Sequence, residues 1–141
     1  MRSRYIVLSA ITLLFSCASS KLPNKNIETK EMIIRISEIE IYPVNLHEYN
    51  AILKEEAEAS VRLEPGVIAI YPMQEKKNPS EIRILEIYAD RQAYEAHLKT
   101  PHFQKYKTTT LKMVKALRLI DMNAIDPQTM PEVFSKMGQK R

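Results

Sequence analysis

Four segments of the chain carry the hydrophobic pattern of β-strands. From Ile33 to Tyr42, isoleucines are interleaved with polar residues, and the broken alternation predicts one buried face with an irregularity near Ser37. Residues 67–71 form a continuous apolar run, which is typical of a strand that is covered on both faces. Two further strands are expected at residues 82–88 and 116–124.

The segments between these strands show helical signals. Asn45, followed three residues later by Glu48, has the pattern of a capping box and predicts the start of the first helix. Asp90 predicts the N-cap of a short second helix, and Thr100-Pro101 predicts that the helix restarts there. The first helix is expected to bury one side of its surface and to leave its charged residues solvated. The expected inner residues are Leu46, Tyr49, Leu53, Ala57 and Ser60, and the expected solvated ones are Lys54, Glu55, Glu56 and Glu58.

The order of these elements predicts an α+β domain over residues 32–125. The arrangement β-α-β-β-α-β is ferredoxin-like, with helices packed on one face of an antiparallel sheet. The other face also needs a cover, because residues 67–71 are apolar throughout, and a second copy of the chain is the simplest cover. A homodimer is therefore expected. Residues 126–141 contain two prolines and many polar residues, and predict a tail or a short added helix.

The N-terminus has the layout of an export signal. Residues 1–16 combine two arginines with an apolar stretch of eleven residues, which is too short to span a membrane, and small residues follow. The run Leu14-Phe15-Ser16-Cys17 resembles a bacterial lipobox, in which Cys17 is acylated and becomes the mature N-terminus. A plain signal peptide with an incidental cysteine is the alternative. Residues 17–31 are polar and predict a tether, so the expected location is the membrane of the cell envelope.

Composition narrows the classes of partner and cofactor. The 141 residues are 45% hydrophobic and 27% charged, and the net charge of +4 falls to +2 without the two signal arginines. Basic and acidic residues are interspersed, which argues against a nucleic-acid partner. The three histidines, His47, His97 and His102, form no recognised metal-ligand spacing with the carboxylates. With only Gly66 and Gly138, the chain has no glycine-rich phosphate loop, so no metal or nucleotide cofactor is expected.

Several short motifs occur together on this strand and helix plan. They are Glu64-Pro65-Gly66, Glu86 with Tyr88, Ala93 with His97, and Thr100-Pro101-His102-Phe103. In this order, the segment from Ile34 to about Asn123 resembles the antibiotic biosynthesis monooxygenase family, which includes small quinol monooxygenases. The resemblance implies a dimer with a barrel-like core and one pocket per subunit between sheet and helices. It also implies oxygenation of phenolic or quinol substrates by molecular oxygen without metal or flavin.

Such chemistry needs a base, because a hydroquinone becomes a much better reductant once it loses a proton. His97 is the candidate base, since an unperturbed histidine titrates near ~6.5, and a purely structural histidine is the alternative. Tyr71 and Tyr88 are expected to line an aromatic pocket, or else to be core residues. His102 is expected to donate to a substrate oxygen, or to decorate a helix turn. Glu86 is expected to orient a histidine, or to form a surface ion pair.

Two other functions stay open at this point. One is a catalytically silent envelope lipoprotein that binds a small apolar ligand in the same pocket. The other is heme degradation, which resembles a neighbouring branch of the same fold. Where relatives often carry a tryptophan after the strand-three glutamate, this chain has Tyr88 and no tryptophan at all, which counts against heme.

Overall fold

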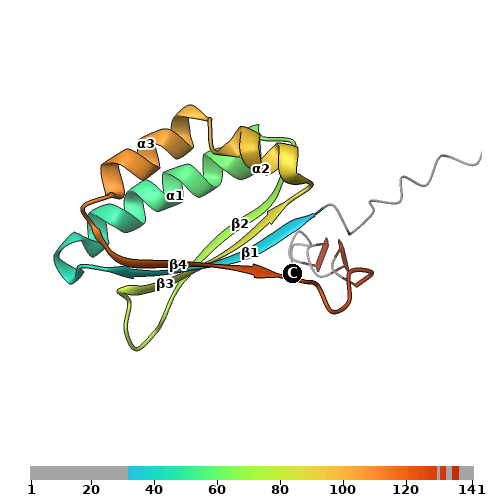
Figure 1. The fold of residues 1–141 in the computed structure, drawn as a ribbon. Helices are drawn as coiled ribbons and strands as arrows, with labels where there is room; N and C mark the ends of the chain where they lie inside the picture. Colours follow the sequence, from blue (N-terminus) through green and yellow to red (C-terminus); the bar gives the residue numbers. More distant parts are fainter. Residues whose placement is uncertain (1–31, 130, 133–134, 137–141) are drawn as a thin grey trace, which may run out of the picture.

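The computed structural model describes residues 32–129, 131–132 and 135–136 (Figure 1). The predictions for the signal, for Cys17 and for the tether over residues 17–31 lie outside this part of the chain. No helix among the described residues has the length and apolar character needed to cross a bilayer. The elements, in order, are β1 (Ile33–Ile41), the 3-10 turn η1 (Pro43–Asn45), α1 (Leu46–Leu63), β2 (Val67–Gln74), β3 (Glu81–Tyr88), α2 (Arg91–His97), α3 (Pro101–Thr110) and β4 (Val114–Met122).

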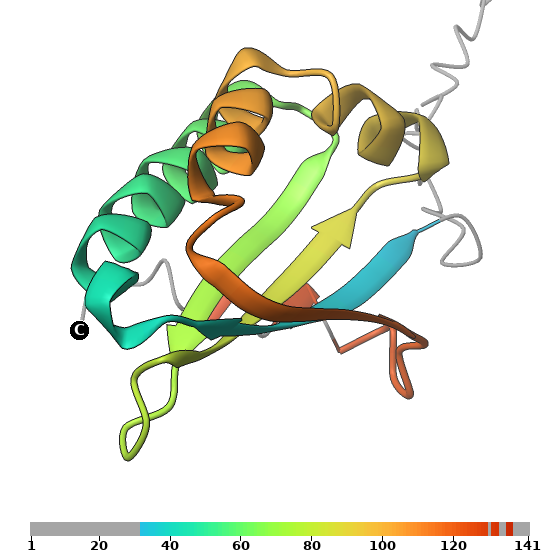
Figure 2. The ribbon, with the colours of Figure 1, turned by 60° about the vertical axis from the view of Figure 1, so that its left-hand side comes forward.

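The four strands form one antiparallel sheet in the order β2-β3-β1-β4. Its three helices lie on one face, and α1 and α3 contact each other (Figures 1 and 2). The predicted ferredoxin-like α+β fold is therefore confirmed, with the second helical region divided into α2 and α3. Because β4 is at the sheet edge and most of its residues are exposed, the space under the helices is open on that side.

The expected irregularity near Ser37 is wrong. Ser37 pairs regularly with Ile84 of β3 and with Leu119 of β4, and the register shifts between Glu40 and Ile41 instead. The alternation in β1 breaks for a different reason. Successive residues of a strand point to opposite faces, and the inner-face positions Arg35 and Ser37 are polar because they line a cavity under the helices.

Two of the three helix caps predicted from the sequence are confirmed. The Asp90 side chain accepts from Ala93 N at 2.7 Å, and the Thr100 hydroxyl accepts from Phe103 N at 3.3 Å. The predicted capping box at Asn45 is wrong, because this side chain makes no cap hydrogen bond. Asn45 ends the 3-10 turn with helical dihedrals rather than the extended ones that a capping side chain needs.

Gly66 brings β2 and α2 unusually close together. A Cβ at this position would lie 2.4 Å from Cβ of Ala93, which is far inside contact distance. The carbonyl oxygen of Gly66 also accepts a hydrogen bond from Ala89 N at 2.8 Å. The glycine is therefore required for close packing, and it places the end of α1 beside the end of α2.

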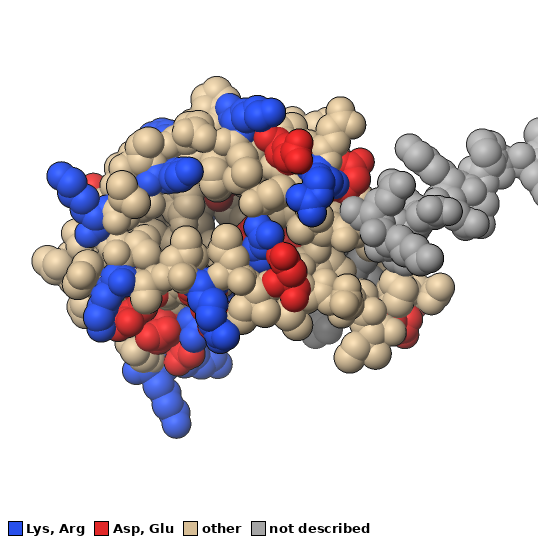
Figure 3. All heavy atoms as spheres, in the orientation of Figure 1, with Lys and Arg blue, Asp and Glu red and all other residues tan. Residues whose placement is uncertain are grey.

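The two faces of the sheet differ in burial. The inner face and α1 share a core that includes Ile39, Ile41, Tyr49 and Leu53. On β2, however, Ile68 is 38% exposed and Tyr71 is 50% exposed, so the single chain does not cover this strand on both faces. The space-filling view shows charged side chains of both signs next to one another, and a hollow between the helices and the sheet edge (Figure 3).

Candidate active site

A cavity of about 390 Å³ lies between the inner face of the sheet and the helices. This volume is at the lower end of the range for small-molecule sites. Its walls are mostly apolar and aromatic, and Leu117 and Leu119 of β4 line its open side. The polar and aromatic groups that the following argument uses are Ser37, Glu56, Glu86, Tyr88, His97 and Tyr106.

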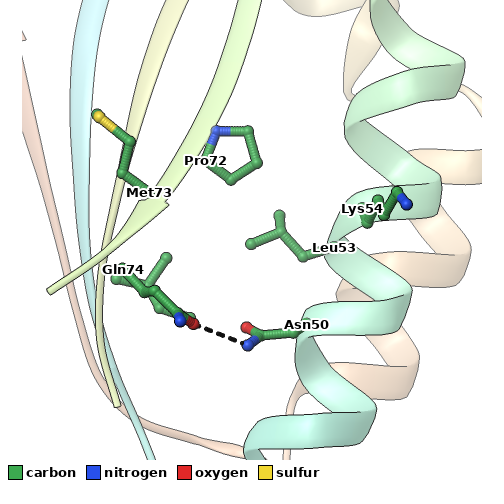
Figure 4. A pocket seen from close by; sticks show the side chains of 7 residues that line it. Asn50, Leu53, Lys54, Pro72, Met73 and Gln74 are labelled. Atoms are coloured by element: carbon green, nitrogen blue, oxygen red, sulfur yellow. Dashed lines mark hydrogen bonds between the residues drawn. The ribbon is translucent and has the colours of Figure 1, made fainter. Parts of the chain in front are cut away.

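A second, smaller pocket of about 260 Å³ lies between α1 and β2 (Figure 4). It is crossed by a hydrogen bond of 3.0 Å from Asn50 Nδ2 to Gln74 Oε1. Lys54 is its only titratable lining residue, and it holds no histidine or carboxylate. The larger cavity is therefore the candidate site for proton-transfer chemistry.

His97 is the last residue of α2 and is only 2% exposed. Its carbonyl oxygen accepts from the Thr100 hydroxyl at 2.8 Å, which fixes the turn between α2 and α3. Its ring packs against Phe103 and Tyr88, with centroid distances of 4.6 and 5.3 Å. The predicted base is thus a buried side chain on the cavity wall, packed between Phe103 and Tyr88.

Glu64, the C-cap residue of α1, defines which nitrogen of His97 carries the proton. Its Oε1 lies 3.0 Å from His97 Nδ1. Partial burial alone would raise the pKa of Glu64, but hydrogen bonds from His102 and His97 outweigh it, so the pKa lies below its usual range. An ionised carboxylate can only accept, so Nδ1 carries the hydrogen and Nε2 keeps its lone pair.

Glu56 approaches the other nitrogen of the ring, with Oε1 3.8 Å from His97 Nε2. The expectation that Glu56 is solvated is wrong, because the residue is buried and accepts a hydrogen bond of 2.7 Å from the Ser60 hydroxyl. Burial raises the pKa of this carboxyl. The spacing held a signal, since Glu56 follows Tyr49 and Leu53 on the buried stripe at seven and three residues.

Glu86 and Tyr88 of β3 both line the cavity. Glu86 accepts from the Ser37 hydroxyl at 2.5 Å through Oε1 and from the Tyr88 hydroxyl at 3.0 Å through Oε2. Burial raises the pKa of Tyr88, and the adjacent Glu86 raises it further, so the phenol stays protonated at neutral pH. The hydrogen-bond partners of Glu86 are therefore a serine and a tyrosine rather than the expected histidine.

The structure separates the other two predicted site residues from the cavity wall. His102 lies behind His97, with Nε2 2.5 Å from Glu64 Oε1. Tyr71 is half exposed on β2 and does not line the cavity.

Arg35, Tyr94 and Tyr106 also line the cavity, but the sequence motifs did not indicate them. Arg35 donates to the Tyr94 hydroxyl at 3.0 Å and pairs with Asp121, which links the sheet to α2 at the end of the cavity. Tyr106 forms a 2.6 Å hydrogen bond with the hydroxyl of Tyr49, and burial raises the pKa of Tyr106 to about 12.

One group of side chains among the described residues could hold a metal ion. The ligand atoms of Glu64, His97 and His102 all lie within 4.8 Å of one another. Residue spacing alone does not predict this grouping, because Glu64 precedes the two histidines by 33 and 38 residues.

Solved structures similar to this chain include several bacterial proteins. A candidate antibiotic biosynthesis monooxygenase from Bacteroides thetaiotaomicron is 52% identical over 71% of this chain and 95% of its own, with a TM-score of 0.70. A candidate monooxygenase from Lactobacillus acidophilus is 28% identical over 67% of this chain and 44% of its own, with a TM-score of 0.64. A Caulobacter crescentus protein, a candidate antibiotic biosynthesis monooxygenase, shares the fold at 20% identity, with 68% and 92% coverage and a TM-score of 0.64.

No protein of curated function matches the chain. The sequence profile of the antibiotic biosynthesis monooxygenases, however, matches residues 32–109. This range includes β1 to β3, the cavity residues Glu56, Glu86 and Tyr88, and the grouping of Glu64, His97 and His102. The chain therefore belongs to the antibiotic biosynthesis monooxygenase family.

Proposed function

We propose that the protein is a cofactor-independent monooxygenase that oxidises a quinol-like or phenolic aromatic with molecular oxygen. The observation that carries the proposal is the pairing of His97 with Glu64 beside an aromatic cavity. With Nδ1 bonded to Glu64, the lone pair of Nε2 is left to accept a substrate proton. The same carboxylate stabilises the imidazolium that forms.

The reaction draws its electrons from the substrate. His97 takes the phenolic proton, and the phenolate passes one electron to O₂, which gives an aryloxyl radical and superoxide. The two combine at a free ring carbon to form a C–O bond, and the peroxide takes a proton back from His97. The O–O bond then breaks as that carbon loses its hydrogen. Phenol and O₂ thus become quinone and water, with one oxygen atom in each product.

The cavity walls suit a flat aromatic substrate. Tyr88, Phe103 and Tyr106 line the cavity, and a substrate ring packed against them would gain aromatic contacts beyond the burial of apolar area. Glu86 is a candidate acceptor for a second substrate hydroxyl, because its carboxylate holds only hydroxyl partners. This role would favour a quinol over a simple phenol.

We also propose that the protein is anchored to a membrane and forms a homodimer. An export signal over residues 1–16 and acylation of Cys17 would anchor the domain to a cell-envelope membrane. A homodimer would cover the exposed apolar residues of the outer sheet face, including Ile68 and Tyr71. The expected partners are thus a second copy, a lipid membrane, a small aromatic and O₂.

Oxygen uptake with a panel of hydroquinones and phenols tests the activity, with protein freed of metal and flavin. His97→Ala should lower turnover roughly 10²–10⁴-fold, the usual contribution of a positioned base. His47→Ala is the matched control, because His47 is exposed on α1 away from the cavity. Full activity in a folded His97→Ala protein would remove His97 from the mechanism.

The same cavity also suits a non-catalytic lipoprotein that binds a small apolar ligand. No oxygen uptake with any phenol, together with saturable binding of an apolar probe, would favour that function. A heme-degrading activity would show itself by a Soret shift on heme titration.

A further inference from the structure

Three potential ligand atoms converge where the ends of three helices meet. Glu64 is the C-cap of α1, His97 ends α2, and His102 is the second residue of α3. Glu64 Oε1 lies 3.0 Å from His97 Nδ1 and 2.5 Å from His102 Nε2. Both imidazoles therefore point a nitrogen at the same oxygen atom.

The three residues are held in this arrangement by the backbone around them. The Thr100 hydroxyl donates to the His97 carbonyl and accepts from Phe103 N, which fixes α2 relative to α3. The contact of Gly66 with Ala93 fixes the turn that follows Glu64 against α2. A set of ligands that is fixed before binding loses little conformational entropy when an ion arrives.

We propose that Glu64, His97 and His102 form a binding site for one divalent ion of the zinc type. Two imidazole nitrogens and one carboxylate oxygen are the ligand set of open zinc sites, whereas magnesium and calcium prefer oxygen ligands alone. Metal–ligand distances of about 2.0–2.1 Å place tetrahedral ligand atoms roughly 3.3 Å apart. Small side-chain rotations reach this spacing, and Glu64 and His102 keep 12% and 18% exposure, which leaves the ion a path from solvent.

A second carboxylate stands where metal-bound histidines usually have one. Such histidines commonly donate their other ring N–H to a carboxylate, which fixes the ring and its tautomer. A metal ion on His97 Nδ1 leaves the hydrogen on Nε2, and Glu56 Oε1 lies 3.8 Å from that atom. Glu56 is itself held by the Ser60 hydroxyl at 2.7 Å. The ligand set and its outer partner are thus both present in one chain.

Metal binding has a consequence for the base. Proton acceptance from substrate needs the lone pair on His97 Nε2 and the hydrogen on Nδ1, whereas metal binding through Nδ1 requires the hydrogen on Nε2. The ion and the substrate proton therefore require opposite tautomers of one ring, and zinc binding switches the base off. This consequence rests on the proposed function, but the metal site itself does not.

Spectroscopic and calorimetric titration of the full chain tests the site. After chelator treatment and dialysis, Co²⁺ should give the visible absorption of a tetrahedral complex with N and O ligands, saturating at one ion per chain. Zn²⁺ should displace it with the same stoichiometry in calorimetry. His102→Ala and Glu64→Gln should weaken Zn²⁺ binding by more than the roughly 10–100-fold that outer-shell partners contribute. His47→Ala, which removes an exposed histidine, should bind as the original chain does.

The results test two claims separately, the metal site and the suppression of the base by zinc. Circular dichroism confirms that the variants are folded, and His102→Asn replaces His102→Ala if the alanine variant is not. No binding at one ion per chain, or equal binding by the original chain and the His102 variant, would overturn the site. Zinc should also suppress oxygen uptake by the original chain, and the residual uptake of the His102 variant should no longer respond. Zinc that binds without suppressing oxygen uptake would overturn the effect on the base and leave the metal site standing. A chain that consumes no oxygen fails the proposed function, and the titration still decides the site.

Discussion

The Nδ1 atom of His97 lies 3.0 Å from Oε1 of Glu64, although 33 residues separate the two in the sequence. Glu64 reaches this position because α1 ends at Leu63 and Gly66 lets the following turn pack against Ala93 of α2. The pair combines a buried imidazole with a carboxylate that is ionised at neutral pH, and this combination is the arrangement that orients a histidine base.

Replacing Glu64 by glutamine tests this orientation. A glutamine can present its amide N–H to Nδ1, which would force the hydrogen onto Nε2 and block proton acceptance. We expect turnover to fall roughly 10²–10⁴-fold while KM changes little, because the lost interaction acts in the transition state.

Glu55→Gln is the matched control and should keep its activity, since Glu55 of α1 is exposed and pairs with Lys105 of α3. Steady-state oxygen uptake of both variants provides the measurement. Equal turnover in the original chain and in a folded Glu64→Gln protein would show that Glu64 does not position the base.

Local signals in the sequence were sufficient for most of the fold. Asp90 and Thr100 cap their helices because a capping side chain bonds to a backbone N–H only three residues away. Strand pattern and turn residues likewise act over short distances. The Asn45 cap failed because the local pattern could not reveal the 3-10 turn that precedes α1.

Fewer of the site residues could be predicted from such local signals. His97, Tyr88 and Glu86 were predicted, and the structure places all three on the cavity wall. Glu56 and Glu64 were missed as site residues, because a glutamate on a helix or at its end is usually solvated and only tertiary packing shows that these two face histidines. Their chemistry depends on partners that are far away in the sequence.

The close approach of Gly66 and Ala93 predicts that a larger residue at position 66 destabilises the protein. In Gly66→Ala the new methyl group would meet Cβ of Ala93 at 2.4 Å, so α2 or the turn must move. Overpacking of this type costs about 1–3 kcal/mol in the free energy of unfolding. Urea denaturation measures the loss.

The double variant Gly66→Ala with Ala93→Gly separates this contact from a general effect on the turn. Removing the facing methyl group should recover part of the loss, even though glycine in a helix costs about 1 kcal/mol by itself. The two substitutions should therefore be less than additive. Strict additivity would show that the close approach is not what requires glycine here.

Lipid anchoring is a prediction from Leu14-Phe15-Ser16-Cys17 and the polar residues that follow. Cys17→Ser removes the thiol that would carry the acyl group, so the variant should lose both incorporation of labelled fatty acid and sedimentation with membranes. Ser20→Ala, three residues further along, should keep both. A Cys17→Ser protein that still sediments as the original does would mean that the chain is held to the membrane by something else.

Dimerisation is predicted from the uncovered side of the sheet, where Ile68 and Tyr71 are exposed in the single chain. A stable, obligate interface usually buries more than ~2,000 Å² in total. Light scattering of the chain without its signal, carrying Cys17→Ser, should give twice the chain mass at micromolar concentration. Tyr71→Glu should shift the mass toward that of one chain, because it would bury an unpaired charge in the interface. Val44→Glu is the control, since Val44 is 89% exposed in η1 at one end of β1 and its substitution should leave the dimer intact. A single-chain mass for the parent protein would contradict the dimer.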